Sequence, residues 1–257
     1  MTTFADLHVP GQPLLLPNVW EFGFAAALVA QGFPAVGTTS LGVSAAHGFA
    51  DGAPGSREVT VALARELVPL DVLVSVDLAD GFSADPGAVA DLVARLAELG
   101  VHGVNLEDGR ADGTLAPVDV QCRLLRTVRA AAPGVFLNAR TDTHWLGTGP
   151  LPDTLARLRA YVEAGADGVF VPGLADPAET AEVVALGAPL NVLFLPGRTT
   201  VAGLAELGVA RVSLGSGPYR AALAAALASV TAARGGDPLP LTPPTYHEVT
   251  GLLPPLR

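Results

Sequence analysis

The chain has 257 residues, of which 50% are hydrophobic and 16% charged, so it can bury a large core. Its formal net charge is −10, which argues against nucleic acid as a partner. No apolar stretch reaches membrane-spanning length without Gly, Pro or charge, and the N-terminus lacks the pattern of a signal peptide. We therefore expect a soluble protein with no membrane partner. The single cysteine, Cys122, cannot form an intramolecular disulfide, so a cytoplasmic location is expected.

All fifteen basic residues are arginine, and the sequence contains no lysine. A Schiff-base mechanism, a P-loop lysine and a lysine general acid or base are therefore excluded. A compositional bias toward Ala, Arg, Gly and Pro explains most of this absence, but the chemical exclusion holds in either case.

Short apolar runs alternate with amphipathic stretches along the chain, which is typical of strand–helix units. The runs predict eight strands, at residues 14–18, 32–40, 71–77, 101–107, 134–140, 166–172, 189–193 and 209–215. The amphipathic stretches predict helices at residues 21–31, 57–68, 85–100, 118–131, 152–164, 177–186, 199–207 and 218–234. Asp85 followed by Pro86 is an N-cap signal and Gly100 a C-cap signal. A Gly/Ala-rich loop is expected after residue 40, through residue 56.

Eight such units predict an α/β fold, a single (β/α)₈ barrel of the TIM type over residues 1–257 with a Pro/Leu-rich C-terminal arm at 235–257. A doubly wound open sheet is the alternative, but it would more usually carry a Gly-rich turn after the first strand, which residues 17–23 lack. In a barrel the chemistry belongs at the carboxyl ends of the strands. The polar residues there are Asn18, Ser40, Asp77, Glu107, Arg140, Asn191 and Ser213.

Asp77 and Glu107 end neighbouring predicted strands, so their carboxylates should converge on one rim. They would repel each other unless a cation or a shared proton offsets the repulsion. With Arg140 nearby, this rim suits a metal and an anionic ligand. Other interpretations stay open at this point, because Asp77 could cap its own loop and Arg140 could be a structural partner of either acid.

Eight segments in this order resemble the isocitrate lyase and phosphoenolpyruvate mutase superfamily, with coverage from about residue 12 to 225. They lie at residues 17–20, 32–40, 77–82, 103–108, 138–142, 166–173, 189–193 and 208–215. The resemblance implies a barrel whose last helix is exchanged with a neighbouring subunit, in a homodimer or homotetramer. It also implies a small carboxylate substrate.

The resemblance further implies a bound Mg²⁺, with Mn²⁺ as a possible substitute, held directly by Asp77. Glu107 and Asp51 would act on the metal mainly through waters, and Arg140 would hold the substrate carboxylate. Asp51 and His47 lie in a segment that matches a gate, and His47 is the histidine considered for proton transfer. The other substrate-binding residues implied are Ser40, Leu41, Gly42, Asn138 and Asn191.

The sequence departs from the family pattern at two places. Ala79 occupies the position of the family's second acid, and the adjacent Asp80 would point the opposite way in an extended chain. Residues 109–117 replace the loop that carries a lysine and a cysteine in the lyase branch and a lysine in the mutase branch. Cleavage of isocitrate or methylisocitrate and mutation of phosphoenolpyruvate are therefore not expected.

The resulting prediction is a Mg²⁺-dependent lyase or decarboxylase that acts on a C–C bond of a small 2-oxo or 2-hydroxy carboxylic acid. The reaction would pass through an enolate that the metal stabilises. Decarboxylation fits the missing loop best, because loss of CO₂ requires no base to remove a substrate proton. The alternatives are a C–C hydrolase, a phosphonopyruvate-type P–C enzyme of the same superfamily, and a non-catalytic barrel that binds 2-oxo acids.

Overall fold

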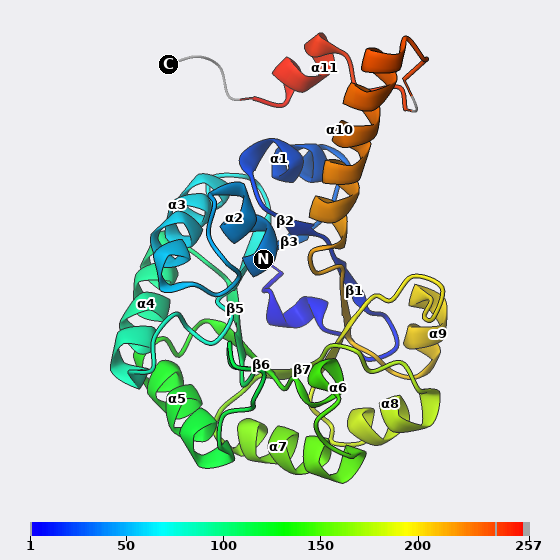
Figure 1. Cartoon of the computed structure of the whole chain (residues 1–257). Helices are drawn as coiled ribbons and strands as arrows, with labels where there is room; N and C mark the ends of the chain where they lie inside the picture. The colour runs from blue at the N-terminus through cyan, green and yellow to red at the C-terminus, as the bar shows by residue number, and fades with distance from the viewer. Residues whose placement is uncertain (1, 240, 254–257) are drawn as a thin grey trace.

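The structure is a computed structural model that describes residues 2–239 and 241–253. Its nine parallel strands follow the order β1-β9-β8-β7-β6-β5-β4-β3-β2 around a barrel (Figure 1). The strands are β1 Leu14–Leu16, β2 Asn18–Val19, β3 Ala35–Thr38, β4 Leu73–Asp77, β5 Gly103–Glu107, β6 Phe136–Arg140, β7 Gly168–Val171, β8 Leu190–Leu193 and β9 Arg211–Ser213. The first predicted strand is divided at Pro17, so that β1 pairs with β9 and β2 with β3. The predicted TIM-type barrel is confirmed.

Helices interleave with the strands and surround the barrel (Figure 1). The α-helices are α1 Phe22–Ala30, α2 Ser40–Ala46, α3 Arg57–Leu67, α4 Pro86–Leu99, α5 Val118–Ala131, α6 Thr143–Leu146, α7 Leu151–Glu163, α8 Pro177–Val184, α9 Val201–Glu206, α10 Gly217–Gly235 and α11 Tyr246–Gly251, and two 3₁₀ turns span Ala5–Leu7 and Pro54–Ser56. The expected loop after residue 40 is wrong in its first part, because α2 begins at Ser40 and buries Val43. Helices α6 and α11 were not predicted either.

The cap signals of α4 are confirmed. The side chain of Asp85 accepts a hydrogen bond from the N–H of Gly87 at 3.0 Å, and Pro86 occupies the first helical position. At the other end Gly100 adopts φ 101°, a left-handed conformation that a side chain would strain. These two signals therefore mark where α4 begins and ends.

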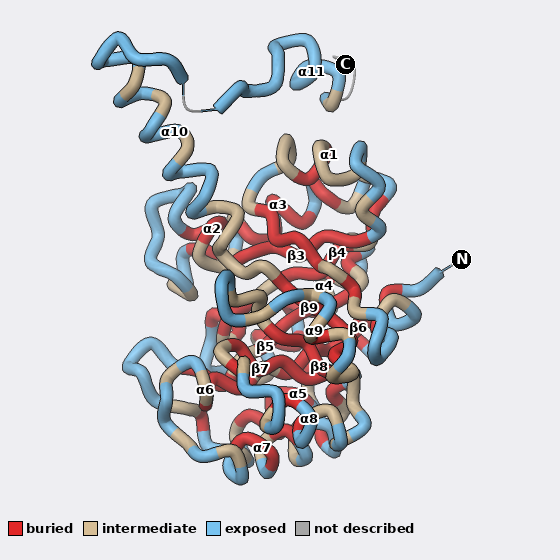
Figure 2. Tube along the Cα trace, turned by 90° about the vertical axis from the view of Figure 1, so that its right-hand side faces the viewer, coloured by how far each residue is buried: buried red, intermediate tan, exposed pale blue. Residues whose placement is uncertain are grey.

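Buried residues are concentrated on the strands and on parts of the surrounding helices (Figure 2). The apolar ones form two clusters. The larger lies between the strands and the surrounding helices. The smaller is built from Phe4, Leu14, Leu16, Ala35 and Phe136, on the N-terminal segment and the first residues of barrel strands. Phe4 contacts the ring of Phe136 edge-on at 5.6 Å between centroids. The N-terminal segment therefore packs onto the amino ends of the strands and leaves the carboxyl ends for the site.

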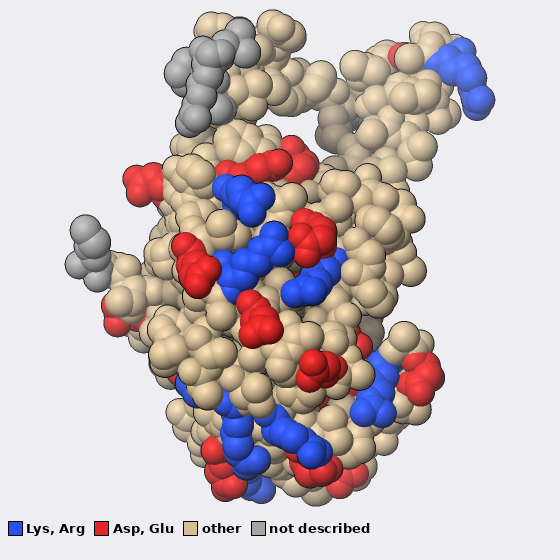
Figure 3. All heavy atoms as spheres, turned by 90° about the vertical axis from the view of Figure 1, so that its left-hand side faces the viewer, with Lys and Arg blue, Asp and Glu red and all other residues tan. Residues whose placement is uncertain are grey.

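Figure 3 shows arginine and acidic side chains intermixed on the face of the barrel that includes α3 and α4. One pair on these helices is Arg95 and Glu58, whose Nη1 and Oε2 atoms lie 3.2 Å apart. Helices α10 and α11 extend away from the barrel (Figures 1 and 2), and α10 contains no buried residue. In the described part of the chain no helix is both long and apolar enough to cross a membrane.

Candidate active site

Asp77 is the last residue of β4, and both its backbone and its side chain are fixed. Its N–H donates to Oγ1 of Thr38 at 2.9 Å, and its Oδ2 accepts from the N–H of Ser40 at 3.2 Å. Both partners lie where β3 passes into α2, so the end of one strand positions the acid of the next. The N–H of Ser40 is therefore engaged by the carboxylate of Asp77.

Two small cavities adjoin each other at the carboxyl ends of the strands. The inner cavity, of about 130 Å³, is lined by Asp77 and Leu41, and the outer, of about 190 Å³, by Glu107 and Ala79. Both share the residues Ser40, Asp51, Arg140 and Trp145. The structure therefore brings together six of the predicted site residues, which are Ser40, Leu41, Asp51, Asp77, Glu107 and Arg140.

Arg140 lies between two carboxylates at the end of β6. Its Nη1 is 2.7 Å from Oε2 of Glu107, while its Nε and Nη2 donate to the two oxygens of Asp142 at 2.6 and 3.1 Å. Burial opposes the charged guanidinium, but Glu107 and Asp142 outweigh burial and raise the pKa of Arg140. Since a guanidinium has five N–H donors, Arg140 keeps donors for a ligand carboxylate in the cavity.

The acids around Arg140 are held in an unfavourable environment for charge. Burial raises the pKa of Glu107 to about 8; Arg140 opposes this shift, while Asp142, Asp77 and Asp51 add to it. Partial burial also raises the pKa of Asp51, with a contact to Ser40 lowering it and the charge of Asp77 raising it further. Acids that raise one another's pKa are the electrostatic pattern expected of a cation site.

The donor chemistry of this cluster fits a largely hydrated Mg²⁺. Asp51 and Asp77 line the same cavity, and Mg²⁺ prefers hard oxygen ligands while keeping several of its waters. Over residues 2–239 and 241–253, no three His, Cys, Asp or Glu side chains are arranged to hold a metal ion by themselves. Water ligands would therefore have to complete the coordination of an ion held by these carboxylates.

Four predicted site residues do not line these cavities. Gly42 lies inside α2, where an added Cβ would be 3.1 Å from the Cβ of Trp20. His47 is exposed, and its Nδ1 is hydrogen-bonded to the carbonyl oxygen of Val43 at 2.9 Å. The proton-transfer role predicted for His47 therefore has no geometric support. Asn138 and Asn191 are buried, each two residues before the last residue of its strand, which is β6 for Asn138 and β8 for Asn191. Asn138 donates to Oδ1 of Asn105 at 2.9 Å.

Sequence reasoning missed Asp142, Trp145 and Arg211. Asp142 lay within a segment that matched the family, but it follows the strand end and was given no role. Arg211 interrupts an apolar strand, which is a visible signal. It is fully buried and donates to Oδ1 of Asn105 at 3.0 Å, and its Nε and Nη1 have no partner among the described residues. Burial lowers the pKa of Arg211 to about 9, although Asp77 opposes the shift.

The expectation that Asp80 points away from position 79 is wrong. It assumed an extended chain, but Ala79 adopts φ 50°, a left-handed conformation uncommon for residues other than glycine. This turn lets Ala79 and Asp80 line the same outer cavity, together with Glu107. Position 79 therefore does face the site, as expected for the family's second acid, and Asp80 supplies a carboxyl group next to it.

The fold and the site define a TIM-type barrel with an acidic, arginine-containing mouth. The family described as phosphoenolpyruvate phosphomutase matches residues 4–234, and the chain belongs to this family. A Mycobacterium tuberculosis (strain H37Rv) protein described as uncharacterized is 45% identical over 253 residues, which are 98% of this chain and 96% of that protein.

Two further relatives are informative. The 2-methylisocitrate lyase of Bacillus subtilis (strain 168) is 31% identical over 168 residues, 61% of this chain and 54% of that enzyme. Among solved structures, a Burkholderia cenocepacia J2315 protein provisionally assigned as a phosphonomutase superposes with a TM-score of 0.83 at 39% identity. That match covers 89% of this chain and 96% of the Burkholderia protein.

Proposed function

We propose that the protein is a Mg²⁺-dependent carbon–carbon lyase or decarboxylase acting on a small 2-oxo or 2-hydroxy carboxylic acid. The observation that carries the proposal is the convergence of Asp51, Asp77 and Glu107 around Arg140 in one mouth of a barrel of this family. The similarity to 2-methylisocitrate lyase supports a C–C bond as the target. The absence of lysine from the whole sequence disfavours chemistry that depends on a lysine in the loop after β5.

In the proposed reaction Arg140 binds the C1 carboxylate, and its pairing with Asp142 and Glu107 fixes the plane of the guanidinium. For a 2-oxo acid, the bond between C3 and a carboxylate carbon breaks, CO₂ leaves, and the electron pair of that bond moves into an enolate with the charge on the C2 oxygen. When bound, Mg²⁺ supplies Lewis acidity at this oxygen. A water held by Asp51 then protonates C3.

The test is a calorimetric titration of Mg²⁺ with and without oxalate, a planar dianion that resembles the enolate of pyruvate. We expect Mg²⁺-dependent oxalate binding in the wild type and its loss in Asp77→Ala. Asp71→Ala is the matched control, because Asp71 is exposed before the start of the same strand. If oxalate does not bind to the wild type, or binds equally well to Asp77→Ala, the proposed site is wrong.

Ala79 favours a second candidate, a barrel that binds 2-oxo acids without turning them over. The missing carboxylate leaves one fewer ligand for the metal's waters, and this would weaken the charge stabilisation on which turnover depends. Screening oxaloacetate and substituted malates for product separates the two candidates once oxalate binding is established. Tight binding with no product from any acid supports the second candidate, and Mg²⁺-dependent product formation excludes it.

We further propose that α10 packs against a second copy of this chain in a homodimer or homotetramer. Leu223, Leu227 and Val230 share one face of α10 and are 49%, 61% and 69% exposed. Light scattering should show an oligomer that Leu227→Glu dissociates, whereas Val162→Glu, at an exposed position on α7, should leave it intact. A monomeric wild type would contradict the proposal.

The buried free thiol of Cys122 is consistent with a reducing, cytoplasmic location, which we also propose.

A further inference from the structure

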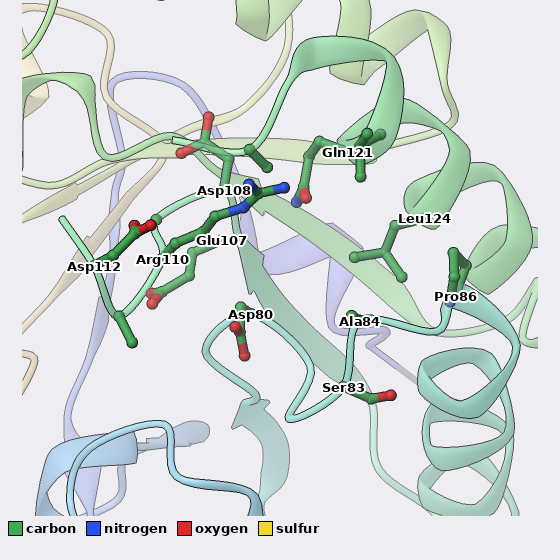
Figure 4. Close-up of a pocket in the computed structure, with 14 residues that line it drawn as sticks. Asp80, Ser83, Ala84, Pro86, Glu107, Asp108, Arg110, Asp112, Gln121 and Leu124 are labelled. Atoms are coloured by element: carbon green, nitrogen blue, oxygen red, sulfur yellow. The ribbon is translucent and has the colours of Figure 1, made fainter. Parts of the chain in front are cut away.

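A third and larger cavity lies beside the mouth of the barrel (Figure 4). Its volume is about 530 Å³, and it lies between residues 78–86, the hairpin of residues 109–115 and the first turns of α5. Apolar side chains form much of its wall, and they are Ala84, Pro86, Ala116, Val120 and Leu124. A concave, partly apolar site of this size is typical of a pocket for a small organic ligand.

The large cavity continues from the proposed active site. It shares Asp80, Glu107, Gly109, Arg110 and Ala111 with the outer mouth cavity, which in turn shares Asp51 and Arg140 with the inner one. The inner cavity of about 130 Å³ has the volume of about four water molecules, which suits an acid as small as oxalate. A substrate whose carboxylate binds Arg140 therefore reaches the large cavity beyond Glu107 only if it is longer than oxalate.

The wall formed by residues 78–86 is built at a cost in backbone strain. Ala79 and Phe82 adopt φ values of 50° and 60°, and both are left-handed residues other than glycine. Such conformations are unfavourable for residues with a Cβ, and they concentrate at functional sites. The N–H of Phe82 donates to Oδ1 of Asp80 at 3.1 Å, which holds the turn against the cavity.

Gln121 presents an unpartnered amide in this cavity. Its side chain lies in the first turn of α5, is 2% exposed, and points toward Glu107 and Arg110 in Figure 4. Its Nε2 has no hydrogen-bond partner among the residues that the structure describes. A buried donor without a partner is unfavourable, so this amide N–H is available to an acceptor on a bound ligand.

Arg110 provides a positive charge next to that amide. It lines both the large cavity and the outer mouth cavity, and Figure 4 shows its side chain crossing toward Gln121. Within residues 2–239 and 241–253 its guanidinium makes no ion pair, although Asp80 and Asp112 are near enough to feel its charge. A guanidinium and an amide N–H side by side form a recognition site for a carboxylate.

We propose that this cavity is the subsite for the substrate's C3 substituent, and that it takes an aliphatic chain of several carbons ending in a carboxylate. Arg110 and Gln121 bind the terminal carboxylate, and the apolar wall contacts the methylene groups. The inference rests on the proposed function, because Arg140 must bind the other end of the same molecule. It assigns the substrate to 2-oxo or 2-hydroxy acids whose C3 carries, besides the group that is lost, a chain of several carbons ending in a carboxylate.

The test compares pyruvate, 2-oxohexanoate and 2-oxoadipate as Mg²⁺-dependent ligands by calorimetry, with oxalate as the reference for the mouth. The two six-carbon acids share a chain and differ in the terminal carboxylate. We expect 2-oxoadipate to bind the wild type at least about tenfold more tightly than 2-oxohexanoate, the factor for one charge-assisted hydrogen bond. Arg110→Met and Gln121→Leu should each reduce this ratio by about the same factor.

Two controls make the result specific. Arg123→Met removes an exposed arginine of α5 that pairs with Asp119 at 3.4 Å, and it should keep the wild-type ratio. Gln121→Glu places a negative charge at the amide position and should invert the preference toward 2-oxohexanoate. The measured quantity is the ratio of the dissociation constants of two ligands on the same variant. A loss of folded protein affects both constants alike and leaves their ratio unchanged.

The outcomes separate the two proposals. If oxalate binds but 2-oxoadipate gains nothing over 2-oxohexanoate, the subsite is wrong and the mouth stands. A preference that persists in both Arg110→Met and Gln121→Leu also overturns the subsite, since the chain would then lie elsewhere. If neither oxalate nor any 2-oxo acid binds, the proposed function fails and the subsite fails with it. A preference for 2-oxoadipate that depends on Arg110 and Gln121, without oxalate binding, supports the subsite and overturns the enolate site.

Discussion

The mouth of the barrel and the layer between β5 and α7 both contain acidic side chains, but only one of the two regions neutralises them fully. Asp108, one residue after Glu107, has a completely buried side chain that accepts from Tyr161 at 2.6 Å, Thr141 at 2.8 Å and Arg157 at 3.1 Å. Its other oxygen accepts from the N–H of Asp142 at 2.9 Å. Glu107 instead faces the cavities, where Arg140 is its one ion-pair partner among the described residues.

This difference follows from the alternation of side chains along a strand. Successive residues point to opposite faces, so Glu107 faces the barrel interior while Asp108 enters the layer of helices. In the helix layer every oxygen of the acid is satisfied, and the arrangement is structural. In the mouth the acids raise one another's pKa, and the unfavourable charge is left for a ligand or a metal to offset. Acidic side chains whose charge is not offset by the protein therefore indicate a functional site better than the presence of acids alone.

The largest expected effect is on stability, and it comes from removing the fully hydrogen-bonded carboxylate of Asp108. Asp108→Ala leaves Arg157, Tyr161 and Thr141 without their common acceptor, and it should lower the free energy of unfolding by about 3–5 kcal/mol. Urea unfolding followed by circular dichroism measures this. Glu107→Ala is the matched control and should cost far less, because Arg140 keeps its two bonds to Asp142. If Asp108→Ala does not fold, Asp108→Asn, which keeps one acceptor oxygen, should be intermediate. Equal losses at positions 107 and 108 would contradict the comparison.

The next effect concerns binding. Arg140→Met removes the cation of the mouth and should weaken Mg²⁺-dependent oxalate binding by roughly 10- to 100-fold, the range for a hydrogen bond to a charged group. Arg157→Met removes the arginine of the other region, and we expect reduced stability with oxalate affinity retained, since Arg157 lies outside the mouth cavities. Titration calorimetry at a temperature where both variants are folded tests both statements. The assignment of Arg140 fails if the two substitutions weaken oxalate binding alike.

A further effect is expected in the pH dependence of stability without metal. The pKa of Glu107 is raised from 4.5 to about 8, chiefly by burial, so the folded chain holds a proton that the unfolded chain has lost between these values. Stability should therefore fall as pH rises from about 4.5 to 8, with Glu107 contributing at most about 1.4 kcal/mol per pH unit. Below this window both states are protonated and the penalty is absent, and above it both are ionised.

Glu107→Gln removes this contribution and leaves the other titrating groups in place. We expect its urea midpoint to decline less than that of the wild type between pH 5 and 8, with both proteins in a chelator. Parallel curves for the two proteins would show that Glu107 is already ionised in the folded state. If the wild-type midpoint declines more steeply, as expected, adding Mg²⁺ should bring the two curves closer, because a bound cation favours the ionised carboxylate of Glu107.

The sequence predicted the part of the molecule that depends on periodicity. Alternating strands and helices gave the barrel, and strand ends placed Asp77, Glu107 and Arg140 at one rim. What it could not predict depends on backbone conformation beyond the strand ends. The left-handed turn at Ala79 brings Asp80 into the site, and no composition signal marks a positive φ at alanine. The gate-like segment predicts a site role for His47, but His47 is the exposed C-cap of α2 and its Nδ1 is hydrogen-bonded to the carbonyl of Val43.

The smallest predicted effect tests whether the mouth can accept one more acid. Ala79→Asp adds a carboxylate to the outer cavity next to Asp51 and Glu107, and aspartate tolerates the left-handed conformation at this position. Because Mg²⁺ binds through waters that carboxylates can accept from, we expect about tenfold tighter Mg²⁺ binding by calorimetry. Ala79→Asn has nearly the same shape without the charge and should give only a small part of this gain. Unchanged or weaker binding in Ala79→Asp would mean that position 79 does not reach the metal's waters, and that the mouth is already complete with the acids it has.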